Sequence, residues 1–266
     1  MKKILLSIGV FGLLAVATVA IFSAVNRGSS SVAGSNSENL ASATPSTGSL
    51  LPLTPAGHSS PKSPVAEKYT GQALKFLGDP QILAKYPVGF VEKKRNQLAD
   101  IIKLIETDPK NPINWMDVGL VKKNFDNFSG VRDVWEYAKL LSPRNSLNYY
   151  NLGNLYAAYL HDNQKAEQNF LEALKLDPNE SLSYLGLAEF YHDFYKAKFD
   201  QVDDVLLAGL KVLPADPNLL LQLGFYYKSL QDKGHALEYF NRFLKLSGVT
   251  GAQQQQIQNE VDALSR

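Results

Sequence analysis

Residues 149–178 read YYNLGNLYAAYLHDNQKAEQNFLEALKLDP. This stretch contains two segments with apolar residues at helical spacing, separated by the polar turn at residues 161–163. Its pattern recurs along the chain, because prolines follow one another at intervals of 34, 35 and 36 residues, at Pro109, Pro143, Pro178 and Pro214. A period of this length predicts a helical solenoid in which each repeat is one pair of helices.

The same intervals separate two further sets of positions. Large residues recur at Trp115, Tyr149, Tyr184 and Leu220, and small residues recur at Gly119, Gly153, Ala188 and Gly224. Residues four apart share one face of an α-helix, so each small residue lies one turn beyond a large one. We expect the small residue to let the partner helix approach closely, and a bulky side chain there to cost about 1–3 kcal/mol. Trp135 and Phe170 are expected to be buried between the paired helices.

The pattern resembles the tetratricopeptide repeat, a helix-turn-helix unit with aromatic, Leu, Gly, Tyr, Ala, Phe, Ala and Pro positions in a fixed order. The second unit follows it most fully, with Tyr149, Leu152, Gly153, Tyr156, Ala166, Phe170, Ala173 and Pro178. The first unit departs from it at Lys122, and the fourth departs at Phe243 and Gly248. The resemblance implies an all-α, right-handed α-solenoid over residues 111–248. Its repeats would span residues 111–145, 146–180, 181–216 and 217–248.

The segments that flank the repeats also carry helical patterns. Residues 65–77 and 91–106 are expected to be helices, so that residues 66–110 hold N-terminal helices and a degenerate repeat. Gln97, Ile101 and Leu104 would be the packing positions of that degenerate repeat. At the other end, residues 252–264 place Ile257, Val261 and Leu264 at helical spacing on a polar segment. Residues 249–266 are therefore expected to form a helix that caps the last repeat.

The N-terminal residues predict a membrane anchor. An uncharged, mostly apolar run of 22 residues covers positions 4–25, and at about 1.5 Å per residue it can cross a hydrocarbon core of about 30 Å. Residues 1–27 are expected to be an uncleaved transmembrane helix, and the alternative is a cleaved signal peptide that leaves the remainder secreted. Two basic residues, Lys2 and Lys3, precede the apolar run, and only Arg27 follows it closely. Because basic residues are enriched on the cytoplasmic side of a membrane, this difference favours a cytoplasmic N-terminus and an extracytoplasmic repeat domain.

Residues 28–65 are rich in Ser, Gly, Ala, Thr and Pro and show no helical period. Such a composition cannot bury enough apolar surface to offset the entropy lost on ordering, so we expect a disordered, flexible linker. This linker would hold the repeats away from the membrane.

Composition argues against several classes of function. The chain has no cysteine, which excludes disulfides, thiolate metal sites and cysteine nucleophiles. Its four histidines are isolated in sequence, and no paired-histidine zinc motif or glycine-rich phosphate loop is present. A net charge of +1 provides no basic stripe for nucleic acid. We therefore expect no enzymatic activity, no cofactor, no metal, no small-molecule substrate and no nucleic-acid partner.

The resemblance also implies where a partner binds. In tetratricopeptide repeats the first helix of each unit lines a concave groove, mainly through residues one place after the packing positions. The corresponding residues here are Met116, Leu120, Asn124, Tyr150, Asn151, Asn154, Leu185, Glu189, His192, Leu221, Gln222 and Phe225. Such a surface suits an extended or helical segment with apolar side chains. The alternative is that the three leucines only pack between neighbouring repeats.

Together these features predict a membrane-tethered scaffold in a bacterial cell envelope, which binds a peptide or partner protein in its concave groove. An alternative is an assembly factor or structural subunit of a secretion, pilus or cell-envelope machine. That protein would self-associate through its convex face or its loops.

Overall fold

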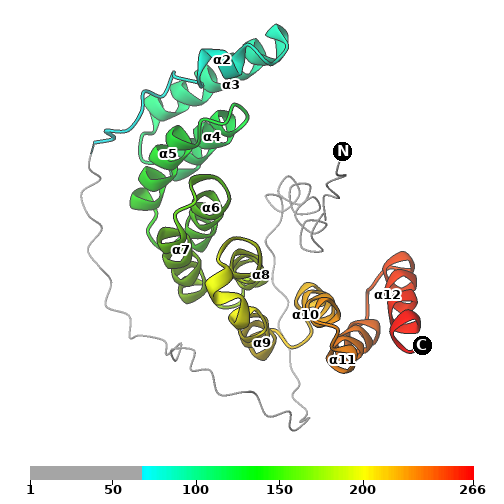
Figure 1. Ribbon diagram of the computed structural model, residues 1–266. Helices are drawn as coiled ribbons and strands as arrows, with labels where there is room; N and C mark the ends of the chain where they lie inside the picture. The colour runs from blue at the N-terminus through cyan, green and yellow to red at the C-terminus, as the bar shows by residue number, and fades with distance from the viewer. Residues whose placement is uncertain (1–67) are drawn as a thin grey trace. The chain divides into compact units, whose positions relative to one another are not determined.

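In the computed structural model, residues 68–266 are described, and their regular structure is entirely helical. Contacts divide them into an N-terminal unit of residues 68–219 and a C-terminal unit of residues 220–266. The N-terminal unit begins with α2 (Pro80–Leu83) and α3 (Val88–Thr107). Three antiparallel pairs follow (Figure 1), namely α4 (Pro112–Lys123) with α5 (Phe128–Leu141), α6 (Ser146–Leu155) with α7 (Asn163–Leu176), and α8 (Ser181–Glu189) with α9 (Val202–Val212). Helix α10 (Pro217–Ser229) starts at the boundary, and α11 (Lys233–Leu244) and α12 (Gly251–Leu264) complete the C-terminal unit.

The paired helices touch where glycine faces a large ring, as the sequence predicted. A Cβ atom on Gly119 would lie 2.0 Å from Trp135 Nε1, and one on Gly153 would lie 2.9 Å from Phe170 Cδ1. Trp135 is 3% exposed and Phe170 is fully buried. These contacts confirm the predicted burial of both rings, and they explain why the small positions recur with the repeat period.

Hydrogen bonds join the recurring aromatic residues to the recurring prolines. Trp115 Nε1 donates to the carbonyl of Pro109 at 2.9 Å. Tyr149 donates to the carbonyl of Pro143 at 3.1 Å, and Tyr184 donates to the carbonyl of Pro178 at 3.1 Å. Each bond spans six residues, so the first helix of a repeat is fixed to the turn that precedes it. The proline and the aromatic residue of each repeat therefore recur together because they are joined by a hydrogen bond.

The turns within the repeats become longer along the N-terminal unit. In the first two pairs the chain reverses at a residue with positive φ. This residue is Asp126 in the first pair and His161 in the second, each with a φ of 53°. The next residue caps the second helix, with Asn127 accepting from the Gly130 N–H and Asp162 from that of Lys165. Helices α6 and α8 each continue as one π-helical turn, η1 (Tyr156–Leu160) and η2 (Phe190–Phe194), and the third pair adds the 3₁₀ helix η3 (Lys196–Gln201). The additional residues therefore lie between the helices of a pair.

The segment before α2 differs from the expectation of a helix over residues 65–77. Residues 68–79, here named the strap, contain no helix. The strap runs antiparallel to α5: the ring of Tyr69 lies 5.4 Å from that of Tyr137, and the backbone N–H of Gln72 donates to Asp133 Oδ2 at 2.9 Å. Contacts to α5 therefore replace the internal hydrogen bonds of the expected helix.

Lys122, which departs from the repeat pattern, is the main partner of the strap. Its side chain is fully buried. Nζ donates to Gln72 Oε1 at 3.1 Å, to the carbonyl of Ala73 at 3.2 Å and to the carbonyl of Phe76. Burial lowers the pKa of this ammonium group to about 8, although Asp133 opposes the change. The lysine thus adds a second donor to carbonyls that also accept from the Phe76 N–H and from Asn127 Nδ2, and these acceptors compensate the buried ammonium group.

Both flanking helices form, but the packing positions expected for the first of them are mostly wrong. In α3 the buried residues are Val91, Leu98, Ile101, Ile102 and Ile105. Gln97 and Leu104 are exposed, so only Ile101 of the three expected positions is buried. Helix α12 packs on α11 through the buried Ile257 and begins at a capping box formed by Thr250 and Gln253.

The expected anchor at residues 1–27 and the expected linker at residues 28–65 lie outside the described residues. Within residues 68–266, no helix is both long enough and apolar enough to span a lipid bilayer.

Candidate functional site

In the N-terminal unit, α4, α6 and α8 lie on one side, and α5, α7 and α9 lie on the other (Figure 1). We name the solvent-facing side of α4, α6 and α8 the inner face, and we name α5, α7 and α9 the outer helices. The expected binding residues that belong to the inner face are Met116, Leu120, Asn124, Tyr150, Asn154, Leu185, Glu189 and His192. All eight are at least partly accessible to solvent. Asn151, also expected at the binding surface, is half-buried on α6.

The first repeat contributes an apolar surface to this face. Leu120 is 43% exposed, and Met116 lies half-buried one turn before it on α4. Two further apolar side chains were missed by the sequence reasoning. Ile113 on α4 is 59% exposed, and Leu147 on α6, in the second repeat, is 37% exposed. Each lies two places before the recurring aromatic residue of its repeat, and that spacing is the signal that could have identified them.

Two asparagines on the inner face are oriented by their own helices. Asn124 Nδ2 donates to the carbonyl of Leu120 at 2.8 Å, and Asn154 Nδ2 donates to the carbonyl of Tyr150 at 3.1 Å. The amide nitrogen of each side chain is therefore occupied within the helix. The amide oxygens remain as acceptors that can receive an N–H from a bound polypeptide.

Tyr150 connects the second repeat to the third. A Cβ atom on Gly186 would lie 2.7 Å from Tyr150 Cε2, and the Tyr150 ring meets Phe170 edge-on at 6.1 Å. Burial raises the pKa of the Tyr150 hydroxyl. Most of this ring is used for packing between repeats, so only part of it is available to a partner.

The third repeat adds ionisable groups to the inner face. Glu189 is the last residue of α8, and burial raises its carboxyl pKa to about 7, an effect that Asp193 strengthens and His192 opposes. His192 Nδ1 lies 2.6 Å from Asp193 Oδ1, and the His192 ring lies 5.2 Å from the ring of Phe199. The inner face therefore changes from apolar at α4 to ionisable at α8.

The three candidates on α10 belong to the C-terminal unit. Leu221 and Phe225 are half-exposed, and the Phe225 ring packs edge-on against Phe240 at 5.0 Å. Gln222, in contrast, is only 3% exposed, and its Nε2 atom has no hydrogen-bond partner in the part of the chain that the structure describes. It lies one turn before the buried Tyr226, on the face of α10 that packs inward. The expectation that Gln222 is part of an accessible surface is therefore wrong.

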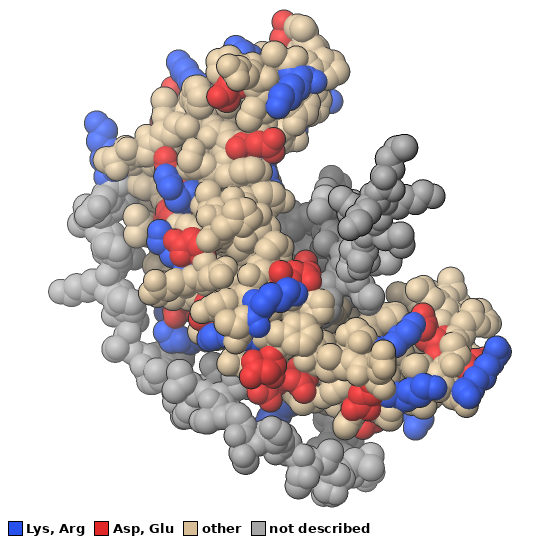
Figure 2. All heavy atoms as spheres, viewed as in Figure 1, with Lys and Arg blue, Asp and Glu red and all other residues tan. Residues whose placement is uncertain are grey.

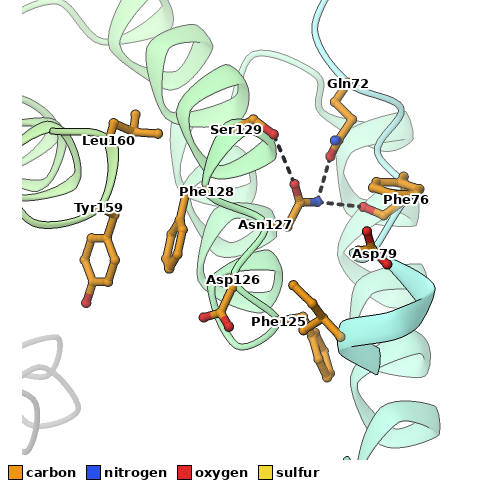
Figure 3. Close-up of a pocket in the computed structure, with 11 residues that line it drawn as sticks. Gln72, Phe76, Asp79, Phe125, Asp126, Asn127, Phe128, Ser129, Tyr159 and Leu160 are labelled. Carbon is orange, nitrogen blue, oxygen red and sulfur yellow. Dashed lines mark hydrogen bonds between the residues drawn. The ribbon is translucent and has the colours of Figure 1, made fainter. Parts of the chain in front are cut away.

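A pocket of about 350 Å³ lies where the strap meets the turns of the first two repeats. Figure 3 shows its polar groups bonded to one another: Asn127 donates to Gln72 at 2.7 Å and to the carbonyl of Phe76 at 3.4 Å, and it accepts from Ser129. Asp79, at the rim, accepts from the N–H of Gln81 at 2.7 Å and so caps α2. The polar groups of this pocket hold the strap in place.

Two other features that bear on a site are groups of metal-ligating side chains and the distribution of charge. No group of three His, Asp or Glu side chains that could hold a metal ion occurs within residues 68–266. On the face seen in Figure 2, basic and acidic side chains are interspersed rather than gathered into a patch of one sign.

Residues 148–180 and 217–249 match the family model of the tetratricopeptide repeat. These two stretches are thus similar in sequence to tetratricopeptide repeats. The first contains most of α6 together with η1 and α7, and the second contains α10 and α11. Repeats of this family form scaffolds for interactions between proteins, so the matched stretches support a role in protein binding.

Two solved structures are similar to this chain. The crystal structure of PilW, a widely conserved type IV pilus biogenesis factor, is 17% identical and has a TM-score of 0.50, over 74% of this chain and 87% of that chain. The crystal structure of MamA is 16% identical and has a TM-score of 0.46, over 66% of this chain and 98% of that chain. At such identities the likeness concerns the fold alone. A comparison with curated protein sequences finds no match.

Proposed function

We propose that this chain is a scaffold whose inner face binds a peptide or a segment of a partner protein. The observation that supports this role most directly is the exposure of apolar side chains along the first helices of successive repeats. Ile113, Leu120 and Leu147 are each more than a third exposed. Covering a leucine side chain of this kind on binding contributes up to about 1.5–3 kcal/mol, and the asparagine amide oxygens add acceptors for backbone N–H groups of the bound segment.

The proposal includes a tether to a membrane. The apolar run at residues 4–25 and the linker composition of residues 28–65 support an anchored protein with the repeats on the extracytoplasmic side of a bacterial envelope. A secreted protein is the alternative if the N-terminal segment is cleaved. Mass spectrometry of the mature N-terminus, together with protease accessibility of the repeats in intact cells, distinguishes the two arrangements.

The binding role can be tested with a matched pair of substitutions. Leu120 on α4 is 43% exposed and Leu140 on the outer helix α5 is 48% exposed, so Leu120→Glu and Leu140→Glu make the same chemical change on opposite sides. Random peptides displayed on phage are first selected on the purified full-length chain in a mild detergent. We expect Leu120→Glu to weaken binding of the selected peptides at least about tenfold. Leu140→Glu should bind them like the unsubstituted chain.

Equal binding by both variants would place the binding surface away from α4 and would refute the proposal. Thermal melting of each variant serves as the control, because a surface substitution at a residue this exposed should change the stability by no more than about 0.5 kcal/mol.

A self-associating assembly factor is the second candidate function. It is supported by the outer helices, each of which carries one exposed aliphatic side chain: Leu140 on α5, Leu171 on α7 and Val212 on α9, exposed by 48%, 43% and 42%. Sedimentation of the full-length chain at increasing concentration tests this candidate. Oligomers that Leu140→Glu dissociates and Leu120→Glu leaves intact would favour assembly through the outer helices.

A further inference from the structure

The third repeat places a carboxylate at an inner-face position where the first two repeats have uncharged side chains. Glu189 directly follows the small packing residue of its repeat, and Leu120 and Asn154 hold the same position in the first and second repeats. Leu185 precedes Glu189 by four residues on α8, so the two side chains share one face of the helix. The third repeat therefore carries an acid where the equivalent positions of the first two repeats are apolar or amide-bearing.

The Glu189 carboxylate is half-buried, and His192 offsets the effects of burial and of Asp193 on it only in part. No residue within 68–266 forms a hydrogen bond or an ion pair with it. Burial raises its pKa to about 7, which means that the surroundings disfavour the charge. Keeping an ionised carboxylate partly out of water without a cation beside it costs stability. A side chain that destabilises the free chain in this way is typical of a functional position.

The groups that surround Glu189 do not supply a full positive charge. On η2, Asp193 is an acid, and His192 Nδ1 lies 2.6 Å from the Asp193 carboxylate, so any charge on His192 is shared with that acid. On α6, Tyr150 contributes a phenol whose pKa is raised by burial and by the nearby carboxylates of Glu189 and Glu180. The negative charge of Glu189 therefore has to be balanced by a proton or by a bound group.

A bound polypeptide can provide that balancing charge. We propose that the inner face selects a segment that places apolar side chains on α4 and α6 and a lysine or arginine against Glu189. This proposal rests on the binding role of the inner face and adds the chemistry of the partner to it. Charge complementarity supports it, because a half-buried carboxylate attracts a cation more strongly than a fully solvated one. The pairing also fixes the direction in which the segment lies, from apolar contacts at the first repeat to the ion pair at the third.

The test uses displayed random peptides selected at pH 8 on the full-length chain and on Glu189→Gln. Glutamine has the same size as glutamate and carries no charge, so this change removes the charge and leaves the fold intact. We expect peptides selected on the unsubstituted chain to favour Lys or Arg at one position, and peptides selected on Glu189→Gln to lose that preference. Glu106→Gln makes the same charge change at an exposed residue of α3, and it should retain the preference.

A second measurement uses one synthetic peptide from the first selection and a version whose cationic residue is replaced by norleucine. On the unsubstituted chain the replacement should weaken binding about tenfold, and on Glu189→Gln it should have an effect of less than about twofold. Binding to the unsubstituted chain should also weaken as salt is increased, because the contact is ionic.

The possible outcomes separate this proposal from the binding role itself. Peptides that bind through Leu120 but show no preference for Lys or Arg would overturn the ion pair and leave the binding role standing. The same preference on Glu189→Gln would also overturn it, because another group would then recognise the cation. A selection that enriches no peptide on any variant would overturn both proposals.

Discussion

The close approach of α4 and α5 makes Gly119→Ala a strong perturbation. A Cβ atom there would lie 2.0 Å from Trp135 Nε1 and 2.5 Å from Trp135 Cδ1. The indole is 3% exposed and its Nε1 donates to the carbonyl of Met116 at 3.0 Å. The added methyl group must therefore displace the ring, and the displaced ring can no longer make this hydrogen bond.

The expected cost follows from three effects. Overpacking at a close-packed joint costs about 1–3 kcal/mol, and a buried polar group that loses its partner costs about 1–3 kcal/mol. Alanine favours the helical state over glycine by about 1 kcal/mol. The net loss of unfolding free energy should be about 2–4 kcal/mol, which lowers the melting temperature of a unit of this size by roughly 5–15 °C.

Tryptophan fluorescence is the assay that reports on this joint. The chain has two tryptophans, Trp115 on α4 and Trp135 on α5, so their fluorescence follows the unfolding of the first repeat. Gly89→Ala on α3 is the matched control, because a Cβ atom there meets nothing within 4 Å. The control should melt at the same temperature as the unsubstituted chain or slightly higher. If Gly119→Ala behaves like the control, then α4 and α5 do not approach as closely as described.

Two other substitutions test buried ionisable groups. In the folded chain the pKa of Glu189 is raised to about 7, above the unfolded value of about 4.3. The folded state then binds more protons, so this residue lowers stability as the pH rises from about 4.5 to about 7. Glu189→Gln should match the unsubstituted chain near pH 4 and exceed it by about 1–3 kcal/mol at pH 8 in urea denaturation; an equal gap at both pH values would contradict this. Lys122→Met should destabilise the first repeat by about 1–3 kcal/mol, because the hydrogen bonds from Nζ to Gln72 and to the carbonyls of Ala73 and Phe76 are lost. A more stable Lys122→Met would mean that the desolvation of the ammonium group outweighs its hydrogen bonds.

The repeats could be predicted from the sequence because their main contacts are local and periodic. Gly119 and Trp135 are 16 residues apart, and the same pairing recurs as Gly153 with Phe170, at a similar separation. Repetition of the pattern confirmed its register, since a chance match at one unit would not recur in the next. The hydrogen bond from Tyr149 to Pro143 is also local, yet sequence spacing alone did not reveal that the two positions interact.

The strap could not be predicted because its partners lie far away in the sequence. A helix was expected over residues 65–77, and Tyr69, Ala73 and Phe76 are indeed spaced as on one face of a helix. The competing contacts join residues about 50 positions apart, as in the bond from Lys122 to Gln72. Local preference was therefore overridden by tertiary hydrogen bonds, as is common for short segments without strong caps.

The sequence predicted which positions lie on the inner face. It did not predict how exposed each side chain is, because exposure depends on the residues packed around it. The same positional rule selected Leu120, which is exposed, and Tyr150, which mostly packs on Gly186. For Glu189, the burial that raises the pKa of its carboxyl became visible only when the neighbouring helices were placed around it. Helical spacing gives the direction of a side chain, whereas its surroundings depend on the adjacent repeat.

Lys122 and the strap together indicate how the first repeat is completed. In the second repeat the equivalent position is Tyr156, whose ring fills this site and whose hydroxyl donates to Glu136 at 2.8 Å. In the first repeat the longer lysine side chain extends past the helix pair to the backbone of residues 72–76. Since a buried ammonium group requires acceptors, Lys122 can be buried here only because the strap supplies them. The strap is therefore a structural element of the first repeat, and its residues Tyr69 and Gln72 lie against α5.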